Sequence, residues 1–203
     1  GDAVALARDY LRGRGVSADA AQARKLFEFA VARGNAQAKW ELALLLRDGK
    51  GGEGDMPRAM KLLHEAVAED EAPALGILGV MARDGVGREK DPREAVQWFR
   101  RGAELRNTWA LAHYGRALIE GLGGVSKDLS QALRLIKLSA FRGNPLGKLY
   151  HGEILAAGDL APKDPVAAQK LFEEARAAVD ADGWIKRRAD EGLRKLQNAG
   201  LVK

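Results

Sequence analysis

The 203-residue sequence contains no cysteine, and this absence excludes several kinds of chemistry at once. A disulfide framework, a thiolate zinc site and a cysteine nucleophile all require that residue. Proline is also scarce, with six residues, whereas Ala and Leu are abundant, a balance that favours helix. No apolar run approaches the roughly 18 residues that span a bilayer, so we expect no direct membrane insertion by this chain.

A sustained stretch of one charge sign is also missing from most of the chain. The formal net charge is +5, and residues 183–203 supply +4 of it, from six basic residues against Asp190 and Glu191. A surface that binds nucleic acid usually carries a longer basic stripe. We therefore interpret residues 183–203 as a solvated terminal helix and expect no nucleic-acid partner.

What the chain does contain is an internal repeat of about 36 residues. Glycine-rich turns recur, each is followed by an aspartate, and four residues after each aspartate stands an alanine. Two large apolar residues then follow, at the spacing of one helix face. The turns begin at Gly13, Gly49, Gly85, Gly121 and Gly158; the aspartates are Asp19, Asp55, Asp91, Asp128 and Asp164; the apolar pairs are Leu26-Phe27, Leu62-Leu63, Trp98-Phe99, Leu135-Ile136 and Leu171-Phe172. We expect each aspartate to begin a helix and the glycines to end the helix before it.

Each repeat is therefore predicted to consist of helix A, a glycine turn, helix B and a short link. We place the repeats at 2–37, 38–73, 74–109, 110–146 and 147–182. A single hairpin cannot bury its apolar face, but stacked hairpins share a continuous core. Residues 183–203 are predicted to form a capping helix, with Ile185, Ala189, Leu193 and Leu196 as its apolar stripe. The predicted fold is all-α, an α/α solenoid forming a single domain over residues 1–203.

These patterns resemble the Sel-one-like repeat, a relative of the tetratricopeptide repeat. The resemblance covers nearly the whole chain and is carried by Gly13-x-Gly15-Val16, Leu78-Gly79, Lys90-Asp91-Pro92, Trp98-Phe99 and Arg142-Gly143-Asn144. It implies a right-handed superhelix whose helices A line a concave groove, used as an adaptor or scaffold for protein complexes. It also implies a bacterial protein that is periplasmic or envelope-associated rather than cytoplasmic. We expect a monomer or a weak oligomer.

Two motifs invite a chemical interpretation that their context does not support. Residues 49–54 satisfy G-x-G-x-x-G, but a dinucleotide site needs this pattern between a strand and a helix. Here the motif joins two predicted helices in phase with the other turns, so we interpret it as a turn. His64-Glu65 begins H-E-x-x-H, yet Ala68 stands where the second histidine belongs. We predict no metal site, no cofactor and no enzymatic activity.

The face of helix A opposite its buried stripe is the predicted binding surface. Arginines recur there between apolar residues, and such a groove would suit a protein or peptide with acidic and hydrophobic groups. The alternative interpretation is that these arginines are solvated helix surface. The candidate binding residues are Arg8, Trp40, Arg47, Arg83, His113, Arg116 and Tyr150.

The four tryptophans carry separate expectations. Trp98 repeats an apolar position of helix B and is predicted to be core, and Trp184 is predicted to pack the cap against the last hairpin. Trp40 and Trp109 are not required by the repeat, so they either pack between repeats or contact a partner. Together with Tyr150 they leave open a polysaccharide- or peptidoglycan-binding module. A hydrolase is the least favoured alternative, since no coupled nucleophile and base are visible.

Overall fold

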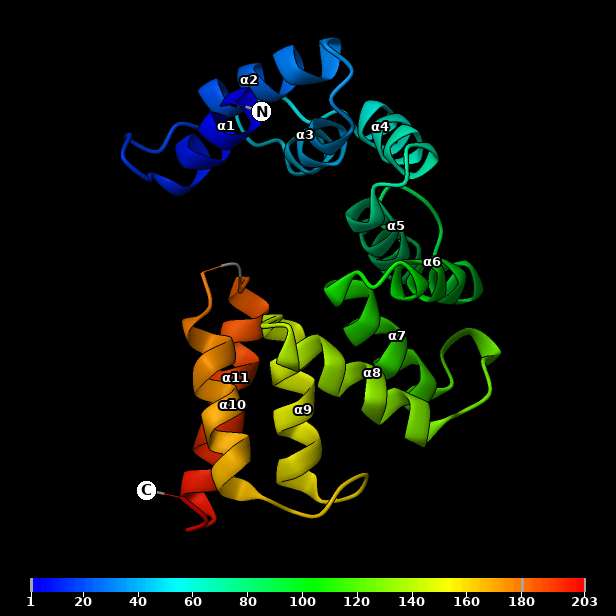
Figure 1. The fold of residues 1–203 in the computed structure, drawn as a ribbon, viewed down its shortest axis with the longest axis vertical. Helices are drawn as coiled ribbons and strands as arrows, with labels where there is room; N and C mark the ends of the chain where they lie inside the picture. The colour runs from blue at the N-terminus through cyan, green and yellow to red at the C-terminus, as the bar shows by residue number, and fades with distance from the viewer. Residues whose placement is uncertain (1, 180, 203) are drawn as a thin grey trace. The chain divides into compact units, whose positions relative to one another are not determined.

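The computed structural model describes residues 2–179 and 181–202, and all regular structure in these ranges is helical (Figure 1). The helices are α1 (Asp2–Arg12), α2 (Ala20–Ala32), α3 (Ala36–Asp48), α4 (Met56–Ala68), α5 (Ala72–Asp84), α6 (Pro92–Glu104), α7 (Thr108–Glu120), the 3-10 helix η1 (Leu122–Gly124), α8 (Leu129–Phe141), α9 (Pro145–Ala157), α10 (Pro165–Ala177) and α11 (Gly183–Asn198). The all-α prediction is confirmed, with α1, α3, α5, α7 and α9 as helices A. None of the helices in the described ranges combines the length and apolar character needed to cross a membrane.

The chain divides into two compact units, Gly1–Lys90 and Asp91–Lys203. In the first unit α1 pairs with α2 and α3 with α4, while α3 also packs on α2 and α5 on α4. In the second unit α9 packs on both α7 and α8, and α11 packs on both α9 and α10. The capping helix α11 thus packs on the fifth repeat in the same way as α9, helix A of the fifth repeat, packs on the fourth. The single domain over residues 1–203 stays a prediction.

The predicted caps of the helices are confirmed. Each of the five aspartates occupies the N-cap of a helix B, and its carboxylate accepts backbone N–H groups of the first turn, as Asp128 does from Gln131 at 2.8 Å. The helices A of the second to fifth repeats end at a glycine in the left-handed conformation, which costs other residues more. These glycines are Gly49, Gly85, Gly121 and Gly158, with φ between 64° and 78°.

A second set of caps was not predicted from the sequence. Asn35, Asn107 and Asn144 begin three of the helices A, and each side-chain oxygen accepts the backbone N–H three residues later at 2.9–3.0 Å. Asp182 begins α11 in the same way. The signal was present in the sequence, because each asparagine ends the link between two repeats, where N-cap residues are favoured.

The core of each hairpin is built on the second residue of the apolar pair in helix B. Those residues are at most 1% exposed: Phe27, Leu63, Phe99, Ile136 and Phe172. The prediction that Trp98 is also core is wrong, because Trp98 is half-buried and its indole N–H donates to Glu94 at 2.9 Å. The first residue of the apolar pair is half-buried in four of the five repeats. This position therefore lies at the edge of the apolar stripe of helix B.

The capping helix α11 packs through the predicted stripe, whose four residues are all buried. Gly152 of α9 and Gly192 of α11 both face the ring of Phe172, and a Cβ at either position would lie within 2.8 Å of it. The two glycines therefore let α9 and α11 close on that ring. The prediction that Trp184 packs the cap is wrong, since Trp184 is 45% exposed. It precedes Ile185 and so lies about 100° around the helix from the stripe.

An ion pair joins helix A to helix B at the same two positions in the second and fifth repeats. Lys39 pairs with Glu65 at 3.5 Å, and Lys148 pairs with Glu174 at 2.9 Å. Lys39 is buried and also donates to Glu69 at 2.6 Å, a hydrogen bond that raises the pKa of its ammonium although burial lowers it. These pairs fix the two helices of one hairpin against each other.

Candidate functional site

In the first unit, the predicted binding residue Arg8 spans two repeats. Its Nε donates to Glu41 Oε1 at 2.6 Å, and its Nη2 pairs with the same oxygen. Glu41 belongs to α3 and its side chain is only 10% exposed, so burial raises the pKa of Glu41, while Arg8 acts in the opposite direction. Arg8 is therefore a link between helices A of the first and second repeats as well as a surface residue.

We expect Glu41→Gln to make the stability of the first unit less dependent on pH. Because the pKa of Glu41 is raised in the folded state, its contribution is fully present below the unfolded pKa of about 4.3 and is lost as the pH rises through the folded pKa. The wild-type chain should thus lose stability relative to the variant as the pH rises above about 4.3 and through the raised pKa of Glu41. Urea unfolding followed by hydrogen exchange in α1 and α3 measures this difference. A difference that is constant with pH, or that grows in favour of the wild type, would reject the argument.

The other predicted residues of the first unit lie close to their own helices. Arg47 donates to Asp48 at 2.6 Å, and Arg83 donates to Asp84 at 2.7 Å. Both arginines stand two residues before the glycine that ends helix A, so the pairing is a repeated feature. Trp40 is half-buried, and its indole N–H is buried without an acceptor in the part of the chain that the structure describes.

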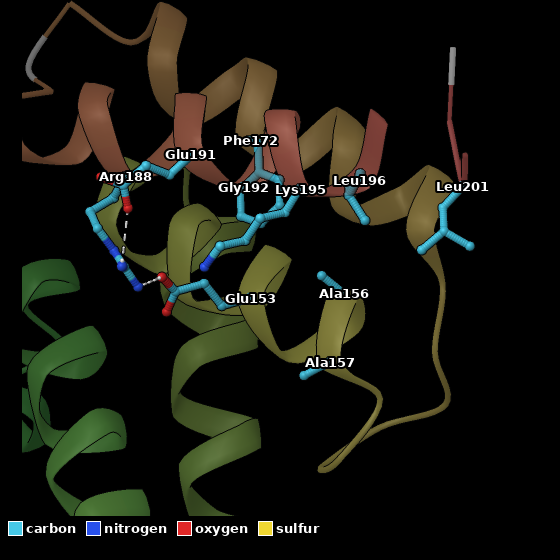
Figure 2. Close-up of a pocket in the computed structure, with 10 residues that line it drawn as sticks. All are labelled: Glu153, Ala156, Ala157, Phe172, Arg188, Glu191, Gly192, Lys195, Leu196 and Leu201. Atoms are coloured by element: carbon cyan, nitrogen blue, oxygen red, sulfur yellow. Dashed lines mark hydrogen bonds and ion pairs between the residues drawn. The ribbon is translucent and has the colours of Figure 1, made fainter. Parts of the chain in front are cut away.

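In the second unit, five side chains of alternating charge join α7, α9 and α11. We call Glu120, Arg116, Glu153, Arg188 and Glu191 the charge ladder. Arg116 contacts Glu120 at 2.5 Å and Glu153 at 3.3 Å. Arg188 contacts Glu153 at 2.5 Å and Glu191 at 3.3 Å (Figure 2). Glu153 is the shared acceptor of two arginines from two different helices. The ladder therefore couples two helices A and the capping helix.

The two aromatic candidates of the second unit, Tyr150 and His113, pack against different elements. Tyr150 is 7% exposed, with the Arg116 guanidinium 5.3 Å from its ring centroid, within the range of a cation–π interaction. His113 stacks on Phe99 of α6, with ring centroids 4.8 Å apart and an interplanar angle of 18°. Of the predicted residues in this unit, Arg116 and Tyr150 are thus brought together, and His113 packs on a helix B instead.

The acidic residues of these ion pairs, and Arg188, were not predicted as site residues. Arg116 and Glu153 both stand five residues before the glycine that ends helix A, so aligning the repeats in register would have placed them side by side. Arg188 carried no such signal, because α11 lies outside the repeat. Glu41 stands alone as a buried acid on its helix, and only the packing of α1 against α3 gives it a partner.

Two further side chains of the second unit, Trp109 and His151, show packing or burial rather than ligand chemistry. Trp109 packs against the buried cluster of the second unit. Burial, followed by the charge of Lys137, lowers the pKa of His151, so its imidazole is neutral near pH 7. No group of three or more histidine and acidic side chains suited to a metal ion occurs within residues 2–179 and 181–202.

Comparison with known proteins agrees with this architecture. The family model of the Sel1 repeat matches residues 3–35, 36–70, 72–107, 110–144 and 146–179. The crystal structure of a Sel1 repeat protein from Oxalobacter formigenes aligns with a TM-score of 0.74 at 26% identity, covering 98% of this chain and 76% of that one. A protective antigen of uropathogenic Escherichia coli strains with an SLR fold aligns with a TM-score of 0.65 at 24% identity, covering 98% of this chain and 46% of that one. An immunity protein from Pseudomonas aeruginosa aligns with a TM-score of 0.64 at 17% identity, covering 99% and 84%. A search of curated proteins finds no match.

Proposed function

Since the chain belongs to the Sel1 repeat family, whose repeats generally form protein-interaction scaffolds, we propose that it binds a protein or peptide on the faces of its helices A. The observation that most supports this is the charge ladder of the second unit. Its arginines and the glutamates that flank them are between 38% and 46% exposed, and such ion pairs contribute little to stability. Partly exposed, complementary charges instead favour specificity and fast association with a partner.

The proposed partner carries acidic and hydrophobic groups. Each predicted arginine is already paired with a carboxylate of this chain, so an acidic group of the partner would replace Asp48 or Asp84, for example, rather than meet a bare cation. Such an exchange yields a modest gain in free energy that salt screens. We therefore expect moderate, salt-dependent affinity. Two of the three rings considered for sugar stacking, Trp109 and Tyr150, are engaged in packing, so no observation favours the glycan alternative.

Site-specific photo-crosslinking tests the proposal. A photoreactive residue at Arg47 or Arg116 lies on the proposed face, and the same residue at Lys61 or Arg100 lies on exposed positions of helices B. Incubated with extract of the native host, the first pair should yield one recurrent crosslinked protein that the second pair does not, and its yield should fall as salt is raised. Crosslinks that are equal for both pairs, or stronger from helices B, would contradict binding on helices A.

The proposal also covers the biological setting. Sel1 repeats typically form non-enzymatic scaffolds, and we extend this to the present chain, with no cofactor and no metal. The solved relatives come from bacteria, which supports a bacterial protein. A periplasmic or envelope-associated location and a monomeric or weakly oligomeric state complete the proposal. Fractionation of the native host would reject that location if the protein were recovered from the cytoplasm alone.

A further inference from the structure

The ends of α6 and α8 and the links that follow them carry an exposed surface that is both apolar and basic. Leu105 is 46% exposed and Phe141 is 89% exposed, although both are large apolar side chains. Arg142 Nη1 donates to the carbonyl oxygen of Arg106 at 3.1 Å, and this hydrogen bond holds the two links together. We call Arg101, Leu105, Arg106, Phe141 and Arg142 the link patch, and all five residues are exposed.

The charge of the link patch has one sign. None of its three guanidinium groups lies within 4.0 Å of a carboxylate of the described residues. Glu104, which precedes the patch residue Leu105, pairs with Arg100 at 3.8 Å. The arginines predicted on helices A differ in this respect, because each of them already pairs with an acid of this chain. A carboxylate of a partner can therefore pair with the link patch without displacing such an acid.

The repeat itself does not require these residues. The last residue of helix B is alanine in the first, second and fifth repeats, whereas it is Phe141 in the fourth. Arg106 has φ +58°, in the left-handed region, and the same position holds Gly34 in the first repeat and Gly143 in the fourth. In the second repeat it holds Asp70, a residue type that tolerates this conformation better than arginine does. Arg106 thus keeps a strained backbone that glycine would relieve, and such strain is typical of functional sites.

We propose that the link patch is a second binding surface, for a segment of a protein partner in which carboxylates flank a large apolar side chain. The apolar side chain packs against Phe141 and Leu105, and the carboxylates pair with the three arginines. Aromatic residues and arginine are the side chains most enriched at protein interfaces. Basic clusters that bind lipid usually contain roughly four to eight lysines and arginines, so three arginines favour a protein over an anionic membrane. The patch lies at the links, so this inference does not depend on binding by the faces of helices A.

The direct test is a titration of the isotope-labelled chain with terminally blocked peptides, followed through its backbone amide NMR signals. The peptides share one sequence except at three central residues, which are Glu-Leu-Glu, Gln-Leu-Gln, Lys-Leu-Lys or Glu-Ser-Glu. We expect Glu-Leu-Glu to shift the signals of Leu105, Arg106 and Phe141 saturably and to bind more tightly than the other three. Phe141→Ala should weaken the binding of Glu-Leu-Glu by roughly two- to fivefold, because it removes the exposed ring.

Arg106→Gly separates binding from folding. Because glycine is favoured at this φ, the variant should keep or raise the Tm of the chain, yet it should weaken the binding of Glu-Leu-Glu by roughly two- to fivefold. Asp70→Gly is the matched control, since it changes the same position of the second repeat, where φ is +61°. It should also keep or raise the Tm, and it should leave the affinity for the peptide unchanged. A lower Tm in Arg106→Gly would refute the strain on which the assignment rests.

The remaining outcomes decide between the occupants. Equal affinity for Glu-Leu-Glu and Gln-Leu-Gln, shifts confined to residues outside the link patch, or no saturable shift up to the solubility limit of the peptides would each overturn the proposal. Equal weakening by Arg106→Gly and Asp70→Gly would overturn it as well. Co-sedimentation with phosphatidylglycerol vesicles, compared with phosphatidylcholine vesicles, tests the membrane. Binding to the anionic vesicles that Phe141→Ala abolishes, without any preference among the peptides, would assign the patch to a lipid surface instead.

Discussion

Phe172→Ala is expected to lower the free energy of unfolding of the second unit by about 3–5 kcal/mol, the usual cost of truncating a buried phenylalanine. Phe172 is 1% exposed, and its ring fills the space that Gly152 and Gly192 leave between α9 and α11. Neither glycine has a side chain that could rotate into the cavity, so relaxation around it is restricted. The loss is a large fraction of the roughly 5–15 kcal/mol that stabilises a typical domain. Hydrogen exchange resolved by peptide should therefore show faster exchange throughout α9, α10 and α11.

The matched control is Phe141→Ala, which removes the same side chain from another helix B. Phe141 is 89% exposed, so its truncation removes almost no buried contact and should change stability by less than about 0.5 kcal/mol. Urea unfolding of both variants gives the comparison. If the two substitutions cost similar amounts, or if α11 kept its protection in Phe172→Ala, the ring would not be what holds the capping helix in place.

Gly51→Ala is expected to destabilise the first unit by more than about 2 kcal/mol. The backbone of Gly51 has φ +74°, a conformation that costs a residue with a Cβ roughly 1–2 kcal/mol. The added Cβ would also lie 2.6 Å from the carbonyl carbon of Ala20, in the first turn of α2, and would overlap the oxygen bonded to it. Since both atoms belong to the backbone, the turn between α3 and α4 must move away from α2 to make room.

Gly34→Ala separates the two parts of this cost. Gly34 has φ +76°, almost the same as Gly51, but nothing lies within 4 Å of an added Cβ. It should therefore lose only the conformational part, about 1–2 kcal/mol. Thermal unfolding of the two variants, with hydrogen exchange in α2 and α3, measures the difference between their losses of stability. That difference is the cost of the overlap between the added Cβ and the backbone of Ala20. Equal losses would mean that the close approach of the turn to α2 does not contribute to the stacking of repeats.

The repeat could be predicted from the sequence because its signals are local. An aspartate at an N-cap and a glycine in a left-handed turn are fixed by the backbone of a few neighbouring residues, so Asp128 and Gly85 could be assigned without knowing what surrounds them. The same holds for residues 49–54, which form a turn between α3 and α4 as predicted. The apolar stripe of α11 could also be predicted from the sequence, since a terminal helix has one buried side.

The candidate site was less predictable, because it depends on contacts between repeats. Helix A was treated as having one buried face and one free face, but a helix A inside the stack is contacted by several helices. Tyr150 and His113 were assigned to the free face on that basis, and the structure places the first under Arg116 and the second on Phe99. The pairing of Arg8 with Glu41 has the same origin, since the register of α1 against α3 cannot be derived from either helix alone.

The ion pair between helix A and helix B has a consequence for how such chains change over evolutionary time. In the second repeat it is Lys39 with Glu65, in the fifth it is Lys148 with Glu174, and in the first repeat the same two positions hold Ala3 and Phe29. A lysine that is mostly buried in the hairpin cannot lose its acid without cost, so the two positions should mutate together. The third repeat holds Leu75 and Arg101 at these positions and the fourth holds Leu111 and Leu138, so in every repeat that lacks the lysine its acid is absent as well.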